Sequence, residues 1–210
     1  MNTLVRLALC TALVSSSLVV VACSSSPASG ETAAALPASG SMAPSFSALD
    51  QAGKVRTVEE FRGRPLVLFF YPADGSPGCT KEACAFRDAW QRYEAANVAV
   101  VGVSTNDVAS HAKFAAEHNL PFPLLADTDQ AMLRAYGVKT TMGFAQRVSI
   151  LVDADGRVAR VWPDVDPGVH ATDVLAAVAA LPAATPQTAP QPAAPTDGTA
   201  APATTTTNDG

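Results

Sequence analysis

The stretch Pro65-Leu-Val-Leu-Phe-Phe-Tyr71 decides the fold, because no charged residue interrupts its apolar side chains. A continuous apolar run of this length is typical of a strand buried on both faces of a sheet. The run from Val98 to Ser104 has the same character, and Thr80 to Asn97 between them shows helical spacing of its apolar residues. These apolar residues are Ala83, Phe86, Trp90 and Tyr93. We therefore predict two parallel strands joined by a crossover helix, a βαβ unit.

Three further helices are expected after this unit. The first extends from Asn106 to Asn119, and the second from Thr128 to Tyr136, where Gly137 closes it. The last extends from Thr172 to Leu181, with Thr172 as its N-cap.

Two strands separate the last two of these helices. Gln146 to Val152 and Arg157 to Trp162 are predicted to form a hairpin across the turn Asp153-Ala-Asp-Gly156. A βαβ unit followed by a hairpin and a helix indicates an α/β protein of thioredoxin-like architecture, a mixed central β-sheet flanked by helices. We place this domain at residues 42–181.

The amino terminus has the plan of an export signal. One arginine precedes an apolar run from Leu7 to Ala22, which is broken by serines and is short for a membrane-spanning helix. The sequence Val20-Val-Ala-Cys23 resembles a bacterial lipobox. We therefore expect residues 1–22 to be removed, Cys23 to be acylated, and residues 23–41, rich in Ser, Ala and Pro, to form a flexible spacer. The protein is thus expected to be exported and lipid-anchored to the bacterial cell envelope, and Ser24 favours the outer membrane of a diderm cell.

The carboxyl terminus and the overall charge add two expectations. Residues 182–210 alternate Ala, Pro and Thr, which is typical of a disordered tail. The formal net charge is −5 and no lysine- or arginine-rich run is present, so we expect no nucleic-acid partner.

Cysteines carry the most specific chemistry in this chain. Cys10 would be lost with the signal and Cys23 would be acylated, which leaves Cys79 and Cys84 as the thiols of the mature domain. Cys79 follows the first buried strand and stands at the first turn of the next helix. Unpaired N–H groups and the helix dipole favour an anion there, so Cys79 is expected to react as a thiolate.

The segment Tyr71-Pro-Ala-Asp-Gly-Ser-Pro-Gly-Cys-Thr-Lys-Glu-Ala-Cys84 resembles the active-site motif of the peroxiredoxins, also called the AhpC/TSA family. Pro72, Ser76 and Cys79 match the positions of that motif. Cys84, five residues after Cys79, matches the resolving cysteine of the peroxiredoxin Q branch, the bacterioferritin comigratory proteins. The resemblance extends over about Ala43 to Leu181, and the lipobox makes this a lipoprotein form.

The resemblance implies a role for each matching residue. Arg147 corresponds to the active-site arginine that holds the thiolate and polarises the peroxide, and Glu82 to a residue that orients this arginine. Ser76 stands where threonine is more common, and it keeps the hydroxyl but loses the methyl group that stiffens the rotamer. Asp74-Gly75 departs from the bulkier residues expected there, which leaves substrate preference open.

The implied reaction is thiol-dependent reduction of hydrogen peroxide and organic hydroperoxides. Cys79 would become a sulfenic acid, Cys84 would condense with it to a redox-active disulfide, and a thioredoxin-like donor would reduce this disulfide. A monomer is expected, and no cofactor is implied.

The spacing of the two cysteines conflicts with an intact helix. Residues five apart rise about 7.5 Å and point roughly 140° away from each other. A disulfide needs Cα atoms within about 7 Å. We therefore expect this turn to unwind during each catalytic cycle.

Three other interpretations remain at this stage. An envelope-tethered thioredoxin-like thiol-disulfide oxidoreductase would need a Cys-x-x-Cys pair, and the spacing here is wider. A non-catalytic binding lipoprotein would carry an unreactive Cys79. A purely structural Cys79–Cys84 staple would gain little chain entropy from so short a loop.

No metal site is expected. His111, His118 and His170 lack ligand spacing, and we predict a solvated role for them. The turn Asp153-Ala-Asp-Gly156 superficially resembles the start of a calcium loop, but no glutamate follows at the required place.

Overall fold

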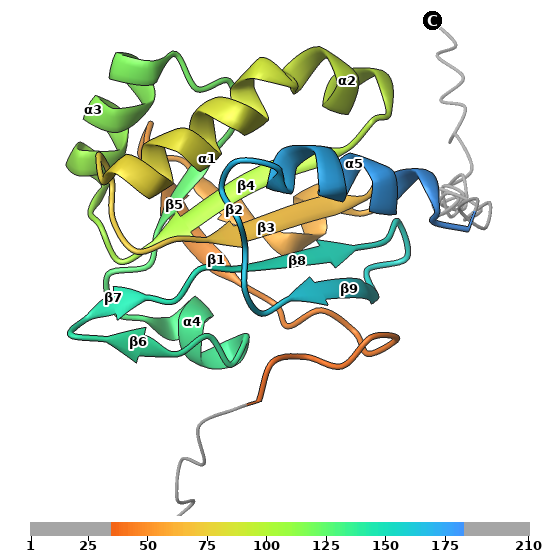
Figure 1. Ribbon diagram of the computed structural model, residues 1–210. Coiled ribbons are helices and arrows are strands. Elements are labelled where there is room, and N and C mark those ends of the chain that lie inside the picture. The colour runs from red at the N-terminus through yellow and green to blue at the C-terminus, as the bar shows by residue number, and fades with distance from the viewer. Residues whose placement is uncertain (1–34, 183–210) are drawn as a thin grey trace, which may run out of the picture. The chain divides into compact units, whose positions relative to one another are not determined.

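The computed structural model describes residues 35–182 (Figure 1). The predicted signal peptide (1–22), the predicted lipidation site Cys23, most of the predicted spacer and the tail from residue 183 lie outside these residues. Within the described range, no helix is both long enough and apolar enough to cross a bilayer.

Strand β3 (Leu66–Phe70) is buried along its whole length, as its apolar run predicts. Its side chains alternate between two hydrophobic clusters, so that Leu68 belongs to one and Phe69 to the other. Strand β4 (Ala99–Ser104) pairs with β3 in parallel, and a helix lies between them in sequence. The predicted βαβ unit is therefore confirmed.

Within residues 35–182 the main sheet has seven strands in the order β2-β1-β5-β4-β3-β8-β9 (Figure 1). Strands β3, β4 and β5 run parallel and all other neighbours pair antiparallel, so the sheet is mixed. The strands not yet given are β1 (Ser47–Asp50), β2 (Val55–Thr57), β5 (Leu124–Ala126), β8 (Val148–Val152) and β9 (Val158–Trp162). A separate small hairpin consists of β6 (Thr140–Thr141) and β7 (Phe144–Ala145).

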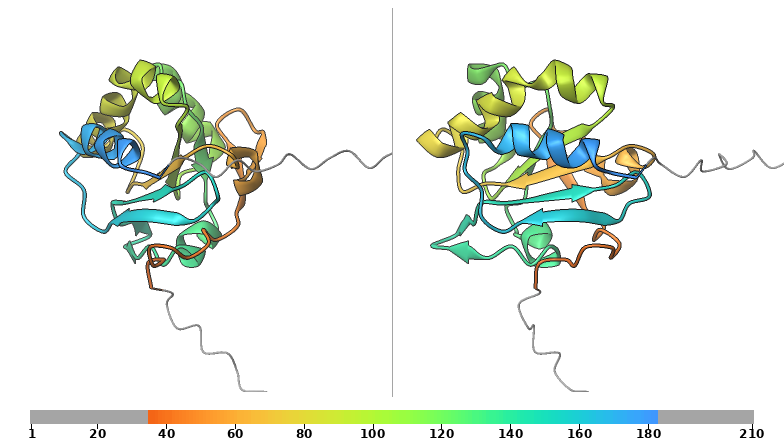
Figure 2. Two further views of the ribbon diagram at one scale, coloured as in Figure 1. Left: turned by 90° about the vertical axis from the view of Figure 1, so that its right-hand side faces the viewer. Right: turned by 45° about the vertical axis from the view of Figure 1, so that its right-hand side comes forward.

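Helices cover both faces of this sheet (Figure 2). One face, in the same cluster as Phe69, receives α1 (Pro77–Asp88), α2 (Trp90–Ala95), α3 (Val108–His118) and α5 (His170–Ala179). The other face, in the cluster of Leu68, receives the short 3-10 helix η1 (Val58–Phe61) and α4 (Ala131–Ala135). The two clusters form a core on each side of the sheet.

The helix predicted from Thr80 to Asn97 is in fact two helices. The chain becomes helical at Pro77 and leaves the helical conformation at Ala89, where φ is −89° and ψ is 3°. Phe86 before this break and Tyr93 after it are both fully buried. The periodicity therefore identifies the core-facing residues but not the interruption.

The last helix starts earlier than predicted. It begins at His170, and the Thr172 N–H donates to the carbonyl of Val169, so Thr172 lies inside the first turn and is not the N-cap. His170 and Ala171 are both buried. Packing of these two residues outweighs the capping preference of threonine.

Helices α3 and α4 are shorter than predicted because aspartates control their first turns. The Asp107 carboxylate accepts the Ser110 N–H at 2.8 Å, which makes Asp107 the N-cap of α3. At α4 the Asp127 carboxylate accepts the Leu133 N–H at 2.8 Å, and Gln130 takes a left-handed conformation with φ 60° just before the helix. Both helices therefore begin after the loops that carry these side chains.

The described chain enters the domain through residues whose composition predicts a spacer. The Gly40 N–H donates to the carbonyl of Val158 at 2.7 Å, and the Val158 N–H donates to the carbonyl of Ser41 at 2.8 Å. Leu36 packs against the core. Gly40 and Ser41 are therefore held along β9 by backbone hydrogen bonds, which small side chains do not reveal in a sequence.

The prediction that the histidines are solvated is wrong for two of the three. His111 is 0% exposed and His170 is 2% exposed. The His170 ring packs edge-on against Phe86 and Trp162, with centroid distances of 5.7 Å and 5.3 Å. Its Nε2 atom has no hydrogen-bond partner among the described residues. Burial lowers the pKa of His170 to about 4, although Asp173 opposes this effect.

We expect His170 to contribute a loss of stability as the pH falls from about 6.5 to about 4. The raised pKa of buried Glu82 acts in the opposite direction over a similar range, so variants are needed to isolate the contribution of His170. In the unfolded chain His170 binds a proton near its ordinary pKa, whereas in the folded protein it stays neutral until about pH 4, so acid favours unfolding. The difference between the two pKa values corresponds to at most about 3 kcal/mol. Urea unfolding of the wild type and of a variant without this imidazole, each at pH 7 and at pH 4.5, measures this contribution.

The matched variants are His170→Leu and, as the control at a half-buried position, His118→Gln. Between pH 7 and pH 4.5 the wild type should lose stability relative to His170→Leu, whereas His118→Gln should follow the wild type. An unchanged pH dependence in His170→Leu would exclude His170 as its source.

Candidate active site

Cys79 occupies the first turn of α1 and is 1% exposed. Ser76 is the N-cap of this helix and Pro77 is its first residue, where the missing N–H of proline costs nothing. The sulfur therefore lies at a helix amino terminus, where free N–H groups and the helix dipole favour negative charge. Cys79 and Cys84 are both free thiols.

Arg147 reaches Cys79 because of the strand register. Strand β8 runs antiparallel to β3 and pairs Val148 with Phe70, so the start of β8 lies beside the end of β3 that leads to α1. The Arg147 Nη2 atom donates to the Cys79 sulfur at 3.3 Å. A Cβ atom added at Gly78 would lie 3.2 Å from the same Nη2 atom, so glycine leaves room for the guanidinium.

Glu82 completes a triad with these two residues. It stands one turn beyond Cys79, is 1% exposed, and accepts a hydrogen bond from Nη1 of Arg147. Burial raises the pKa of Glu82, while Arg147 opposes the rise. Burial works against the charge of Arg147, but Glu82 and Cys79 together raise the pKa of the guanidinium above its ordinary value. The arginine therefore remains charged between two acidic groups.

Ser76 and Pro72 lie on the loop between β3 and α1, and both are half-buried. The Ser76 carbonyl accepts the Thr80 N–H at 2.8 Å, whereas the Ser76 hydroxyl makes no hydrogen bond to the helix end. The hydroxyl is thus not committed to capping the helix and is available to a substrate.

Cys84 does not belong to this contact group. It is half-buried on α1, and the helix is continuous from Cys79 through Cys84. One turn further on, Nη1 of Arg87 donates to the carbonyl of His118 at 2.8 Å, which joins α1 to the end of α3. The structure therefore shows the reduced, helical arrangement of the two thiols.

A polar group behind the loop is not apparent from the sequence. The Asp74 carboxylate accepts hydrogen bonds from the Ser110 hydroxyl at 2.6 Å and the Tyr71 hydroxyl at 2.7 Å, and it contacts His111 Nδ1 at 2.9 Å. Asp74 lies inside the motif quoted in the sequence analysis, where it is connected only with substrate preference. Neither Ser110 nor His111 stands near it in sequence, so only the fold brings them together.

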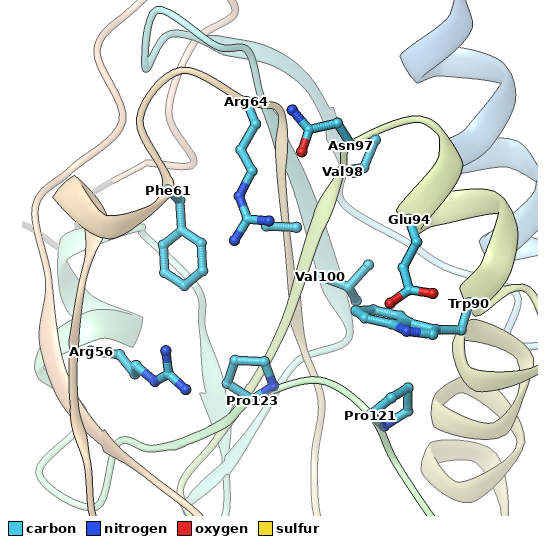
Figure 3. A pocket seen from close by; sticks show the side chains of 11 residues that line it. Arg56, Phe61, Arg64, Trp90, Glu94, Asn97, Val98, Val100, Pro121 and Pro123 are labelled. Carbon is cyan, nitrogen blue, oxygen red and sulfur yellow. The ribbon is translucent and has the colours of Figure 1, made fainter.

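A pocket at the other end of the central strands is lined by neither cysteine nor histidine (Figure 3). Arg64 lies over the ring of Phe61, with its guanidinium carbon 5.8 Å from the ring centroid, and Arg56 is paired with Asp50 and Glu60. The pocket is lined by Arg56, Phe61, Arg64, Trp90, Glu94, Asn97, Val98, Ala99, Val100, Pro121 and Pro123. Within residues 35–182 no group of three or more His, Cys, Asp or Glu side chains could hold a metal ion.

Comparison with known proteins places this site in context. Residues 39–161 match the model of the AhpC/TSA family. A Coxiella burnetii protein assigned as peroxiredoxin bcp is 38% identical over 143 residues, which cover 65% of this chain and 95% of that protein. The chloroplastic peroxiredoxin Q of Triticum aestivum is 42% identical over 125 residues, or 59% of this chain, and the match spans only 58% of the plant protein.

Solved structures have the same architecture. Peroxidoxin BcpB from Mycobacterium tuberculosis superimposes with a TM-score of 0.65 at 34% identity, covering 69% of this chain and 97% of that chain. The bacterioferritin comigratory protein of Xanthomonas campestris, studied for its alkyl peroxide reduction activity, gives a TM-score of 0.61 at 33% identity over 64% of this chain and 90% of that one. The predicted thioredoxin-like fold is confirmed.

Proposed function

Because this chain belongs to the AhpC/TSA family, the peroxiredoxins, we propose that Cys79 is the peroxidatic nucleophile of its thiol-dependent peroxidase activity. The observation that carries this proposal is the 3.3 Å contact between the Cys79 sulfur and Arg147 at the amino terminus of α1. A cysteine held between a helix amino terminus and a guanidinium is suited to react as a thiolate.

The substrates in this proposal are hydrogen peroxide and organic hydroperoxides. The Cys79 thiolate attacks the terminal oxygen of the peroxide, a sulfur–oxygen bond forms, and the oxygen–oxygen bond breaks. The leaving oxygen takes up a proton and departs as water or an alcohol, and Cys79 becomes a sulfenic acid. Arg147, the Ser76 hydroxyl and the Cys79 N–H stabilise the charge that develops on the oxygens. The alkyl peroxide reduction activity of the Xanthomonas campestris relative supports the organic substrates.

Cys84 resolves the sulfenic acid in the second step. Its thiolate attacks the Cys79 sulfur, a sulfur–sulfur bond forms, the sulfur–oxygen bond breaks, and the hydroxyl group takes up a proton and leaves as water. An external dithiol of the thioredoxin type then transfers two electrons and two protons and restores both thiols. Because α1 is continuous through both cysteines, its first turns must unwind before the two sulfurs can meet.

We also propose that the mature protein works as a monomer anchored outside the cytoplasm through acylated Cys23. The support is the lipobox-like sequence Val20-Val-Ala-Cys23 behind an apolar run. Metabolic labelling with a fatty acid, followed by comparison with Cys23→Ala, tests the anchor. Labelling that persists in the variant would refute it.

One equivalent of hydrogen peroxide should convert the reduced wild-type protein to a species two hydrogens lighter, with a Cys79–Cys84 bond. Cys84→Ser should still consume one equivalent but should stop at the Cys79 sulfenic acid and lose steady-state turnover by at least about 10²-fold. Intact-protein and peptide mass spectrometry after rapid alkylation distinguishes the products.

Two outcomes would contradict the proposed reaction. A wild-type protein that leaves peroxide untouched but reduces insulin would instead support a thiol-disulfide oxidoreductase. Full turnover by Cys84→Ser would show that Cys84 is not the resolving thiol.

A further inference from the structure

The loop that carries Ser76 into α1 is anchored by a buried charge. The Asp74 side chain is 7% exposed and the His111 side chain is 0% exposed, with Oδ2 of Asp74 2.9 Å from Nδ1 of His111. Two hydroxyl groups also bind this carboxylate: Ser110 donates to Oδ2 and Tyr71 donates to Oδ1. Burial alone would disfavour a charge here, but hydrogen bonds from His111 and Ser110 hold the pKa of Asp74 below its ordinary value.

This cluster ties the loop to the ends of three parallel strands. Tyr71 directly follows β3, and the Asp74 N–H donates at 3.0 Å to Oδ1 of Asn106, which follows β4. The Asn106 N–H in turn donates to the Ser104 hydroxyl oxygen at the end of β4, at 3.1 Å. On the far side of the imidazole, Nε2 of His111 donates to the carbonyl of Leu125 in β5, at 3.1 Å. The anchor thus connects the loop to the rigid centre of the sheet and to α3.

The anchor lies immediately before the segment that has to change shape. Asp74 stands five residues before Cys79, and the first turns of α1 must unwind before Cys79 and Cys84 can bond. Between the anchor and the helix, the described loop has a weak turn bond, Ser76 N–H to Ala73 carbonyl at 3.4 Å, besides the bond from the Thr80 N–H to the Ser76 carbonyl, which belongs to the helix itself. Among the described residues, Asp74 is therefore the last one before α1 whose side chain is hydrogen-bonded to the rest of the domain.

We propose that Asp74, held by Ser110 and His111, is a positioning residue that favours the helical form of α1 and so sets the rate at which Cys79 forms its disulfide with Cys84. The inference rests on the proposed function, in which that disulfide resolves the sulfenic acid. Asp74 touches neither thiol. It acts by fixing the start of the segment, so that loosening it makes the unwound form more accessible.

The expected result is an acceleration of one step only. Asp74→Asn keeps the shape of the side chain but removes its charge, and Ser110→Ala removes one donor. We expect disulfide formation after one equivalent of hydrogen peroxide to be about tenfold faster in Asp74→Asn, equivalent to about 1.4 kcal/mol, and several-fold faster in Ser110→Ala. The preceding loss of the Cys79 thiol should not become faster, because it needs the helical form with Arg147 in place.

The matched control is Asp50→Asn. Asp50 is also a buried aspartate, 2% exposed, and is paired with a cation, Arg56, at 2.8 Å, but it lies on β1 away from α1. Its loss should lower stability and leave the disulfide rate unchanged. Equal acceleration in Asp50→Asn would reduce the effect to general destabilisation and overturn the proposal.

A second measurement does not depend on peroxide chemistry. Amide hydrogen exchange of the reduced protein should be about tenfold faster at residues 78–84 in Asp74→Asn, and also faster in Ser110→Ala, which keeps the Asp74 carboxylate and guards against a misfolded first variant. If Ser110→Ala shows both a wild-type exchange rate at these amides and a wild-type rate of disulfide formation, the proposed role of the anchor is overturned. A wild-type protein that consumes peroxide without forming the disulfide would overturn the proposed resolving step, and the exchange data would then decide the anchor alone.

Discussion

Replacing Cys79 with serine should lower the rate of peroxide consumption by a factor on the order of 10³ or more. Serine is nearly isosteric and fits the same buried first turn of α1, but its hydroxyl is a far weaker nucleophile and Arg147 cannot make it an effective alkoxide. The measurement is the initial rate of hydrogen peroxide loss with excess dithiol, alongside the melting temperature of both proteins.

The control for this loss is Cys84→Ser, which should retain one rapid turnover. Substantial activity in Cys79→Ser with an unchanged melting temperature would transfer the nucleophilic role to Cys84 and contradict the proposed mechanism.

The second large effect is expected at Arg147. Arg147→Lys should slow the reaction of Cys79 with hydrogen peroxide by about 10²–10³-fold, the loss typical of removing one electrostatic donor from an active site. Arginine uses Nη1 for Glu82 and Nη2 for Cys79 at the same time, and the single ammonium group of lysine cannot reproduce this fork. Lysine does keep a charge beside buried Glu82, so the fold should survive and the loss should fall on the chemistry.

Stopped-flow measurement of the second-order rate constant tests this expectation. Arg160→Lys is the matched control, because Arg160 is an exposed arginine on β9 that stacks on Trp162, with 4.7 Å between its guanidinium carbon and the ring centroid. Arg160→Lys should react at the wild-type rate. A wild-type rate in Arg147→Lys would mean that a simple positive charge suffices and that the two-pronged contact has no catalytic role.

Much of the fold could be predicted because its signals are local. The apolar run of β3 predicts a strand buried on both faces, and the turn Asp153-Ala-Asp-Gly156 predicts the β8–β9 hairpin. The exact helix ends could not be predicted in the same way. They depend on which residues the core accepts, as the burial of His170 at the start of α5 shows.

The candidate site could likewise be predicted only in part. Cys79 is recognisable in the sequence because a cysteine that follows a buried strand lies at the amino terminus of the next helix. The free N–H groups there favour a thiolate. Glu82 and Arg147 are expected from resemblance, and the structure shows the contact between them. The prediction for the buried histidines is wrong because burial is a property of the packed chain. Nothing next to His111 in sequence reveals that Asp74 lies against it.

The sequence by itself therefore determined the βαβ unit, the strand–loop–helix setting of Cys79 and the spacing of Cys79 and Cys84. These features rest on hydrophobic periodicity and covalent distance, which act between near neighbours. Only the tertiary structure decided that Arg147, 68 residues from Cys79, contacts its sulfur, and that Asp74 is anchored on α3. The physical reason is that these contacts depend on strand register and on the packing of helices against the sheet, which join residues that the chain keeps far apart.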